Sequence, residues 1–147
     1  MTGSILTPLL LDTNIISDMM RDLQGPAARR AMAADPSSAS RPLYTSAVVQ
    51  CELEYGLARR KNARLEVAYQ GVMATVEVLP ITSDVAEHYA RLRTQLEALG
   101  QPIGPNDALI AAHALALDAT LVSADAEFRR VPGLRVENWL EPENTAK

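Results

Sequence analysis

Two short runs of largely apolar residues, each closed by an aspartate, constrain the fold of this chain more than any other feature. Leu9–Leu11 ends at Asp12, and the run 120–124 ends at Asp125. Apolar runs without polar alternation are typical of strands buried on both faces, as in a parallel sheet covered by helices. Each aspartate therefore follows the carboxyl end of a predicted strand, which is the edge where open α/β sheets bind ligands.

Helical and strand patterns alternate along the rest of the chain. The spacing of apolar residues and the turn signals predict helices within residues 14–23, 26–33, 48–60, 62–75, 84–99 and 105–117, and strands at 76–79 and 135–139. Residues 43–46 fit a short strand or the lead-in to a helix, and the Ser- and Pro-rich stretch 35–42 is predicted to be a loop. This alternation predicts the α/β class: one domain at residues 1–140 with a mainly parallel sheet of four or five strands and helices on both faces, followed by a polar tail at 141–147.

Helix starts are predicted from residues that suit N-caps. Asn14 is expected to cap the first helix, and Asp84 stands three residues before Glu87, which is the spacing of a capping box. Either Asn106 or Asp107 fits the cap of the nearly all-apolar helix that follows.

Composition excludes several classes of protein. A net charge of −4 argues against broad, nonspecific binding to nucleic acid, so any such contact must be local. The apolar stretch 5–11 is interrupted by Thr7 and Pro8, which makes it too short for a signal peptide or a membrane span. The single cysteine, Cys51, excludes an internal disulfide and is expected to fill a small space in the core. We therefore expect a cytoplasmic protein with no membrane contact.

Four acidic residues can meet at the ligand-binding edge of the predicted sheet. Asp12 and Asp125 follow strands, while Glu52 and Asp107 lie in helical patterns that can face the same crevice. Carboxylates gathered in one place repel one another unless a cation joins them. Mg²⁺ and Mn²⁺ prefer such oxygen ligands, and a site of this kind suits phosphodiester hydrolysis by a metal-activated water. No glycine-rich phosphate-binding pattern follows the first strand.

Each of these acids also has an ordinary structural interpretation. Asp107 can serve only as an N-cap, Glu52 as an exposed helix acid, and Asp125 as a cap for the turn into Phe128. Asp12 is the hardest to explain in this way, because an acid at the end of a buried strand loses solvation unless something compensates it. The prediction of a metal site therefore depends on the four acids together.

A series of motifs, in order along nearly the whole chain, carries a family resemblance. They are Leu9–Ser17, Thr45 and Ser46 followed by Glu52–Gly56, Gly104–Asp107 running into Ile110–Ala114, Leu121–Ser123 with Phe128, and Val136–Leu140. Together they resemble the PIN-domain toxins of the VapC type. The resemblance implies a PIN-like α/β/α domain, a Mg²⁺- or Mn²⁺-dependent endoribonuclease acting on a structured RNA such as tRNA or rRNA, a VapB-type antitoxin as partner, and a homodimer.

The same resemblance implies roles for individual residues. Asp12, Asp107 and Asp125 are the implied metal ligands, with Glu52 binding directly or through water. The fourth motif departs from the family pattern, because a serine replaces the usual threonine and the spacing to Phe128 is one residue shorter. Asp125 is favoured as the fourth acid because it follows the strand end directly, and Glu127 is the fallback. Supporting polar roles are expected for Asn14, Ser46, Asn106 and Ser123.

Two basic features have alternative interpretations. The densest basic group is Arg59, Arg60, Lys61 and Arg64, which suits contacts with an RNA backbone and equally suits a solvated helix end. His113 lies on the face of its helix opposite Asp107, where a core or partner-facing histidine is expected rather than a metal ligand.

The expected antitoxin contact has two parts. An Arg or Lys of the antitoxin is predicted to enter the acidic pocket, and a helix of the antitoxin to lie along a groove that includes Ile16, Met19, Met20 and Tyr55. An alternative function is a PIN-like binding module that acts mainly through its complex with a DNA-binding antitoxin and has weak or no nuclease activity.

Overall fold

The computed structural model describes residues 7–33 and 42–141, and its centre is a parallel sheet. The strands are β1 (Leu9–Leu11), β2 (Leu43–Ser46), β3 (Glu77–Leu79), β4 (Thr120–Val122) and β5 (Val136–Glu137), in the order β3-β2-β1-β4-β5. All four strand pairings are parallel. The predicted mainly parallel sheet is therefore confirmed, and residues 43–46 form a strand.

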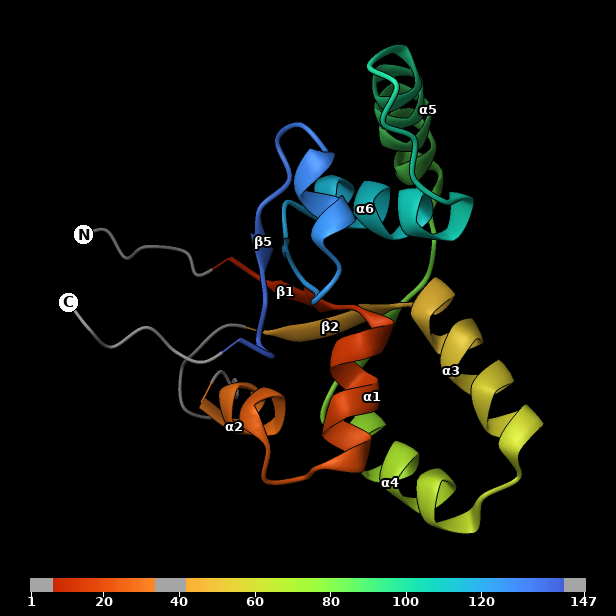
Figure 1. Ribbon diagram of the computed structural model, residues 1–147, viewed down its shortest axis with the longest axis vertical. Helices are drawn as coiled ribbons and strands as arrows, with labels where there is room; N and C mark the ends of the chain where they lie inside the picture. The colour runs from red at the N-terminus through yellow and green to blue at the C-terminus, as the bar shows by residue number, and fades with distance from the viewer. Residues whose placement is uncertain (1–6, 34–41, 142–147) are drawn as a thin grey trace, which may run out of the picture.

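Helices cover both faces of the sheet. They are α1 (Thr13–Arg21), α2 (Pro26–Ala33), α3 (Ala47–Arg60), α4 (Ala63–Met73), α5 (Ser83–Ala98) and α6 (Pro105–Leu117), with a short 3-10 helix, η2, at Ala126–Arg130. Figure 1 shows α1 to α4 on one side of the strands and α5 and α6 on the other. The three-layer α/β/α arrangement predicted from the sequence is confirmed.

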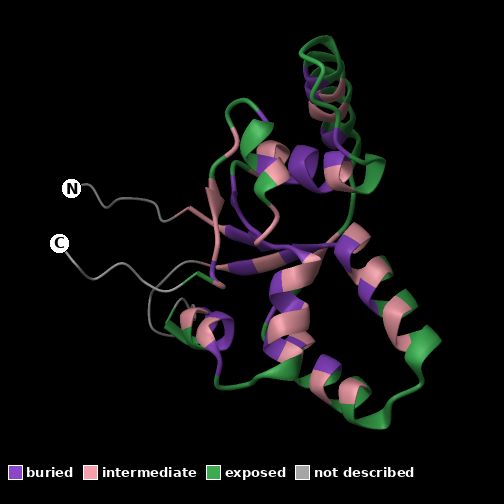
Figure 2. Ribbon diagram, viewed as in Figure 1, coloured by how far each residue is buried: buried purple, intermediate pink, exposed green. Residues whose placement is uncertain are grey.

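The core lies where these layers meet (Figure 2). Every residue of β1 is fully buried, and so are Leu121 and Val122 of β4, because helices cover both sides of these central strands. Helix α6 is apolar on nearly all sides and packs between the sheet and α5, where its alanines allow close approach. Burial of this kind stabilises the fold by roughly 1.5–3 kcal/mol for each large apolar side chain.

Three helix starts differ from the predictions. Asp12, not Asn14, caps α1, and its carboxylate accepts a hydrogen bond of 2.8 Å from the Thr13 amide. Helix α5 has its N-cap at Thr82, so Asp84 lies inside the first turn and the predicted capping box does not form. The cap of α6 is a glycine followed by proline, which places Asn106 and Asp107 in the first turn and makes neither of them the cap.

The structure also tests the predicted burial of Cys51 and part of the predicted loop and tail. Cys51 is exposed, so the prediction that it fills a core space is wrong: it lies on the solvent side of α3, while Val49 and Leu53 of that helix face the core. The predicted loop at 35–42 and the predicted tail at 141–147 lie almost wholly outside the described residues. Among the helices described, none is long and apolar enough to cross a membrane.

Candidate functional site

Two of the predicted acids meet because their strands are neighbours. Leu11 of β1 pairs with Val122 of β4, so the residues that follow these strands emerge together at the carboxyl edge of the sheet. The amide of Asp12 donates to the carbonyl of Val122 at 2.9 Å, which holds Asp12 beside the turn that carries Asp125. The sheet itself therefore determines the position of both aspartates.

Helices bring the other two acids to the same place. Helix α3 follows β2 directly, and Glu52 lies in its second turn. Asp107 lies in the first turn of α6. A cleft of about 700 Å³ at this edge is lined by Asp12, Glu52, Asp107 and Asp125. The structure thus brings together all four carboxylates that the sequence singled out.

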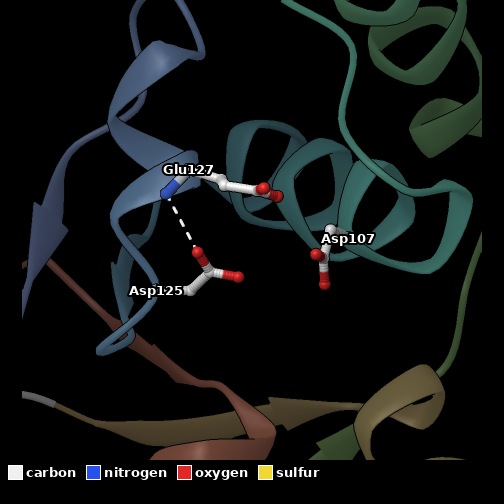
Figure 3. Close-up of side chains that lie close together, drawn as sticks. All are labelled: Asp107, Asp125 and Glu127. Atoms are coloured by element: carbon white, nitrogen blue, oxygen red, sulfur yellow. Dashed lines mark hydrogen bonds between the residues drawn. The ribbon is translucent and has the colours of Figure 1, made fainter.

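The tightest group of carboxylates in the described part of the chain is not the set predicted as metal ligands. Asp107, Asp125 and Glu127 each offer one carboxylate oxygen, and these oxygens all lie within 4.8 Å of one another. Figure 3 shows the three side chains converging: Asp107 from the start of α6, Glu127 from η2 and Asp125 from the N-cap of η2. The Glu127 amide also donates to the Asp125 carboxylate at 2.9 Å. An all-oxygen donor set of this kind fits a hard divalent cation.

The electrostatics of the cleft disfavour ionisation of its acids. Burial, followed by the charges of Asp12, Asp125, Glu52 and Glu127, raises the pKa of Asp107 from 3.8 to about 6. Burial also raises the pKa of Asp12, although hydrogen bonds from Ser123 and the Thr13 amide oppose that shift. A bound cation would offset this repulsion.

Neutral side chains orient the acids. The Ser123 hydroxyl donates to the Asp12 carboxylate at 2.7 Å and accepts from the Asp125 amide at 3.0 Å, so it links the two strand-end aspartates. Glu52 accepts a hydrogen bond of 2.5 Å from the Thr13 hydroxyl and a longer one of 3.4 Å from the Asn106 amide. These contacts limit the rotation of the Asp12 and Glu52 carboxylates. In metal sites, hydrogen-bonding partners that do not bind the metal themselves orient the ligands in the same way.

Two of the predicted supporting residues act differently from the rest. Asn14 accepts a hydrogen bond from the Ala124 amide at 3.2 Å, which holds the turn after β4 against α1. Ser46 caps α3 through the Val48 amide and lies 2.9 Å from Nδ1 of His113, so its hydroxyl faces away from the cleft acids. His113 is 2% exposed, and its burial lowers its pKa, which agrees with the core interpretation.

The predicted basic group is divided by the structure. Arg59 and Arg60 line a second groove of about 250 Å³ between α1, α3 and α4, whereas Lys61 and Arg64 are not among its described lining residues. Arg21 lines both this groove and the acidic cleft.

Sequence reasoning missed three residues that line the cleft, Thr13, Ser17 and Arg21, and assigned a fourth, Tyr55, only to the antitoxin contact. A signal was present, because Thr13, Ser17 and Arg21 are spaced by four residues and so form a polar stripe along one face of α1.

Comparisons with known proteins identify the family. The family model described as the PIN domain matches residues 9–134 of this chain. Ribonuclease VapC2 of Rickettsia felis is 38% identical over 96 residues, which cover 64% of this chain and 72% of that protein. The tRNA(fMet)-specific endonuclease VapC of Salmonella typhimurium is 33% identical over 96 residues, covering 64% and 73% respectively.

A solved structure supports the same assignment. One chain in the crystal structure of VapBC2 from Rickettsia felis matches the present chain with a TM-score of 0.82 and 30% identity. That structure was solved with VapBC2 bound to a DNA fragment from its promoter. The match covers 89% of the present chain and 98% of that chain. The chain therefore belongs to the PIN-domain family, and its relatives are of the VapC type, as the sequence motifs implied.

Proposed function

We propose that this chain is the toxin of a type II toxin–antitoxin pair and an endoribonuclease that requires Mg²⁺ or Mn²⁺. The observation that carries the proposal is the cleft in which Asp12, Glu52, Asp107 and Asp125 meet beside Glu127, with no cationic side chain paired to them among the described residues. The names of the VapC relatives, which are ribonucleases, support the same reaction class.

The cleft residues divide the work of phosphodiester hydrolysis. Asp107 and Asp125, with Asp12, would hold the cation, and Glu52 would bind it directly or through a water. A divalent ion bound there supplies an acidified water and neutralises charge on the scissile phosphate. Glu52, which accepts hydrogen bonds from Thr13 and Asn106, would take a proton from the attacking water. The water oxygen would bond to phosphorus, the bond from phosphorus to the 3′ oxygen would break, and the 3′ oxygen would take up a proton from solvent. The products would carry a 5′-phosphate and a 3′-hydroxyl.

The end groups of the products test this mechanism. Purified protein is incubated with structured RNA in Mg²⁺, in Mn²⁺ or in EDTA, and the new ends are analysed by phosphatase and kinase labelling. We expect metal-dependent cleavage that yields 5′-phosphate ends. A 2′,3′-cyclic phosphate would instead show that the ribose 2′-hydroxyl attacks, which would contradict the proposed mechanism.

We propose tRNA or rRNA as the substrate. Support comes from the Salmonella relative, whose name specifies tRNA(fMet). Brief expression followed by transcriptome-wide mapping of new RNA ends would identify the target. Growth arrest that Asp12→Ala relieves is expected of a nuclease, whereas unchanged arrest would favour the binding-module alternative.

The proposed partner is a VapB-type antitoxin. The Rickettsia neighbour was solved as a VapBC complex, and a cationic antitoxin side chain would neutralise the cleft acids of this chain. Ile16 is fully buried in the core, so the prediction that it supplies the antitoxin surface is wrong. Met19 is largely buried but lines an apolar groove between α1, α2 and α4. We propose this groove as the antitoxin surface, because Leu23 on it is 64% exposed and Met32 is 74% exposed.

Copurification tests the partner and the assembly. The protein is purified with the product of its neighbouring gene, and mass and ribonuclease activity are measured. We expect a homodimer of the toxin that carries two antitoxin chains and is inactive on RNA. A monomer that binds no neighbour, or a complex that is fully active, would contradict this part of the proposal and leave the nuclease chemistry standing.

A further inference from the structure

The acidic cleft does not end at the carboxylates. Thr13, Ser17, Arg21 and Glu52 line both the cleft and the groove between α1, α3 and α4, so the two spaces are continuous. An extended chain that enters the cleft can therefore continue along α1 and α3 without crossing the body of the domain.

The charge changes sign along this path. The cleft is acidic, whereas Arg21, Arg59 and Arg60 line the groove from the last turns of α1 and α3. None of these three arginines forms an ion pair with a carboxylate in the described parts of the chain. Although the chain as a whole has a net charge of −4, these three guanidinium groups form a local basic surface. The phosphate backbone of RNA requires a surface of this kind for binding.

An exposed aromatic ring lies beside both the cleft acids and one of the arginines. Tyr55 lies one turn after Glu52 on α3, lines the cleft, and is 64% exposed. The guanidinium carbon of Arg59 lies 5.4 Å from the centre of its ring. An exposed ring of this kind, next to cationic side chains, is the arrangement on which single-stranded nucleic acids stack their bases.

We propose that the cleft and the groove together bind an unpaired stretch of the RNA substrate. The base beside the scissile phosphate stacks on Tyr55, and the phosphates that follow contact Arg21, Arg59 and Arg60. This assignment rests on the proposed ribonuclease function and names the residues that position the RNA beside the acids. Duplex RNA is excluded from such a path, because its bases are already stacked and paired.

Equilibrium binding tests the inference without relying on cleavage. The probe is a fluorescent, unpaired eight-nucleotide RNA, and the Asp107→Asn variant is used as background so that the probe stays intact. We expect Tyr55→Leu to weaken binding roughly 5- to 100-fold, whereas Tyr55→Phe, which keeps the ring, stays within about 2-fold. Arg21→Gln and Arg59→Gln should each lower the slope of log affinity against log salt by about 0.7.

Helix α5 offers a matched control. Arg93 lies 5.6 Å from the centre of the Tyr89 ring, which repeats the Tyr55–Arg59 spacing on the other side of the sheet. Arg93→Gln removes the same charge and should leave the salt slope unchanged. A duplex of the same sequence should bind at least about 10-fold more weakly than the single strand.

The outcomes separate this inference from the proposed function. If the variants weaken binding and no cleavage is found under any metal, the hydrolytic mechanism fails and the assignment of the RNA path stands. If cleavage is normal and the Tyr55 and arginine variants change neither affinity nor KM, the assignment of the path is overturned. It is equally overturned if these variants spare RNA binding and only weaken inhibition by the antitoxin, because the groove would then be a protein-binding surface.

Discussion

The carboxylates of the cleft and those of the outer surface have opposite surroundings. On the surface, Asp118 pairs with Arg135 at 3.0 Å and Glu97 pairs with Arg93 at 3.3 Å. In the cleft, the acids lie beside other acids and neutral donors such as Ser123, and Arg21, which also lines the cleft, forms no ion pair with them in the described part of the chain. The chain therefore neutralises carboxylates where solvent already screens them and leaves them unpaired where burial makes charge costly.

This difference indicates function rather than stability. Exposed ion pairs contribute only about 0–1 kcal/mol each, so the surface pairs matter little for the fold. Gathering unpaired acids in a half-buried cleft opposes folding, and perturbed groups of this kind concentrate at functional sites. The comparison predicts that removing a cleft carboxylate harms activity and spares the fold, whereas removing a surface carboxylate changes neither activity nor the fold.

The largest expected effect is the loss of a cleft aspartate. Asp107→Asn and Asp12→Asn should each reduce RNA cleavage more than about 100-fold, because each removes a proposed metal ligand while keeping its shape. The matched surface control is Asp118→Asn, since asparagine tolerates the left-handed backbone there (φ 53°). Single-turnover cleavage rates and circular dichroism are measured together. Wild-type activity in either cleft variant would remove that residue from the site.

A second prediction concerns the shortened fourth motif. Asp125 lines the cleft and also belongs to the tight cluster, whereas Glu127 belongs to the cluster only. We therefore expect Asp125→Asn to lower the cleavage rate roughly 10- to 100-fold and Glu127→Gln to lower it less. Mn²⁺ titrations of cleavage on both variants check the order. The reverse order would make Glu127 the fourth acid.

Two buried serines allow a sharper version of the comparison. Ser123→Ala removes the hydroxyl between Asp12 and Asp125 and should weaken Mn²⁺ binding about 10- to 100-fold. Ser46→Ala removes the cap of α3 and the contact with His113, so it should cost about 1 kcal/mol of stability with little change in Mn²⁺ affinity. Calorimetric titration and urea unfolding distinguish the two effects. Equal losses of Mn²⁺ affinity would mean that Ser123 acts only through the fold.

The smallest expected effect is a pH dependence of the metal-free protein. The pKa of Asp107 is raised from 3.8 to about 6, so its protonation favours the folded state below about pH 4, and that contribution is lost as the pH rises through about 6. In EDTA at pH 7.5, Asp107→Asn should therefore be more stable than wild type by about 1 kcal/mol after allowance for solvent screening. Most of that gain should disappear at pH 4.5. Urea unfolding at both pH values measures it, and Asp118→Asn should show no such gain.

Features that depend on neighbouring residues alone were predictable from the sequence. The apolar run that ends at Asp12 predicted a buried parallel strand and placed that acid at the ligand-binding edge, because side-chain burial and strand geometry follow a local pattern. The same reasoning placed Asp125 beyond β4 and Asp107 at the start of α6. These positions, with the motifs around them, were enough to define the fold and the four acids.

Only the tertiary structure decided which side chains meet. Glu127 joins Asp107 in the tight cluster because η2 turns its side chain toward α6, and the hydroxyl of Ser46 turns away from the acids to His113. Arg21 reaches the cleft because α1 packs beside α3. The polar stripe of α1 shows from the sequence that Thr13, Ser17 and Arg21 share a face, but not what that face meets. Distances between side chains depend on how helices far apart in sequence pack on the sheet and on the direction of each side chain.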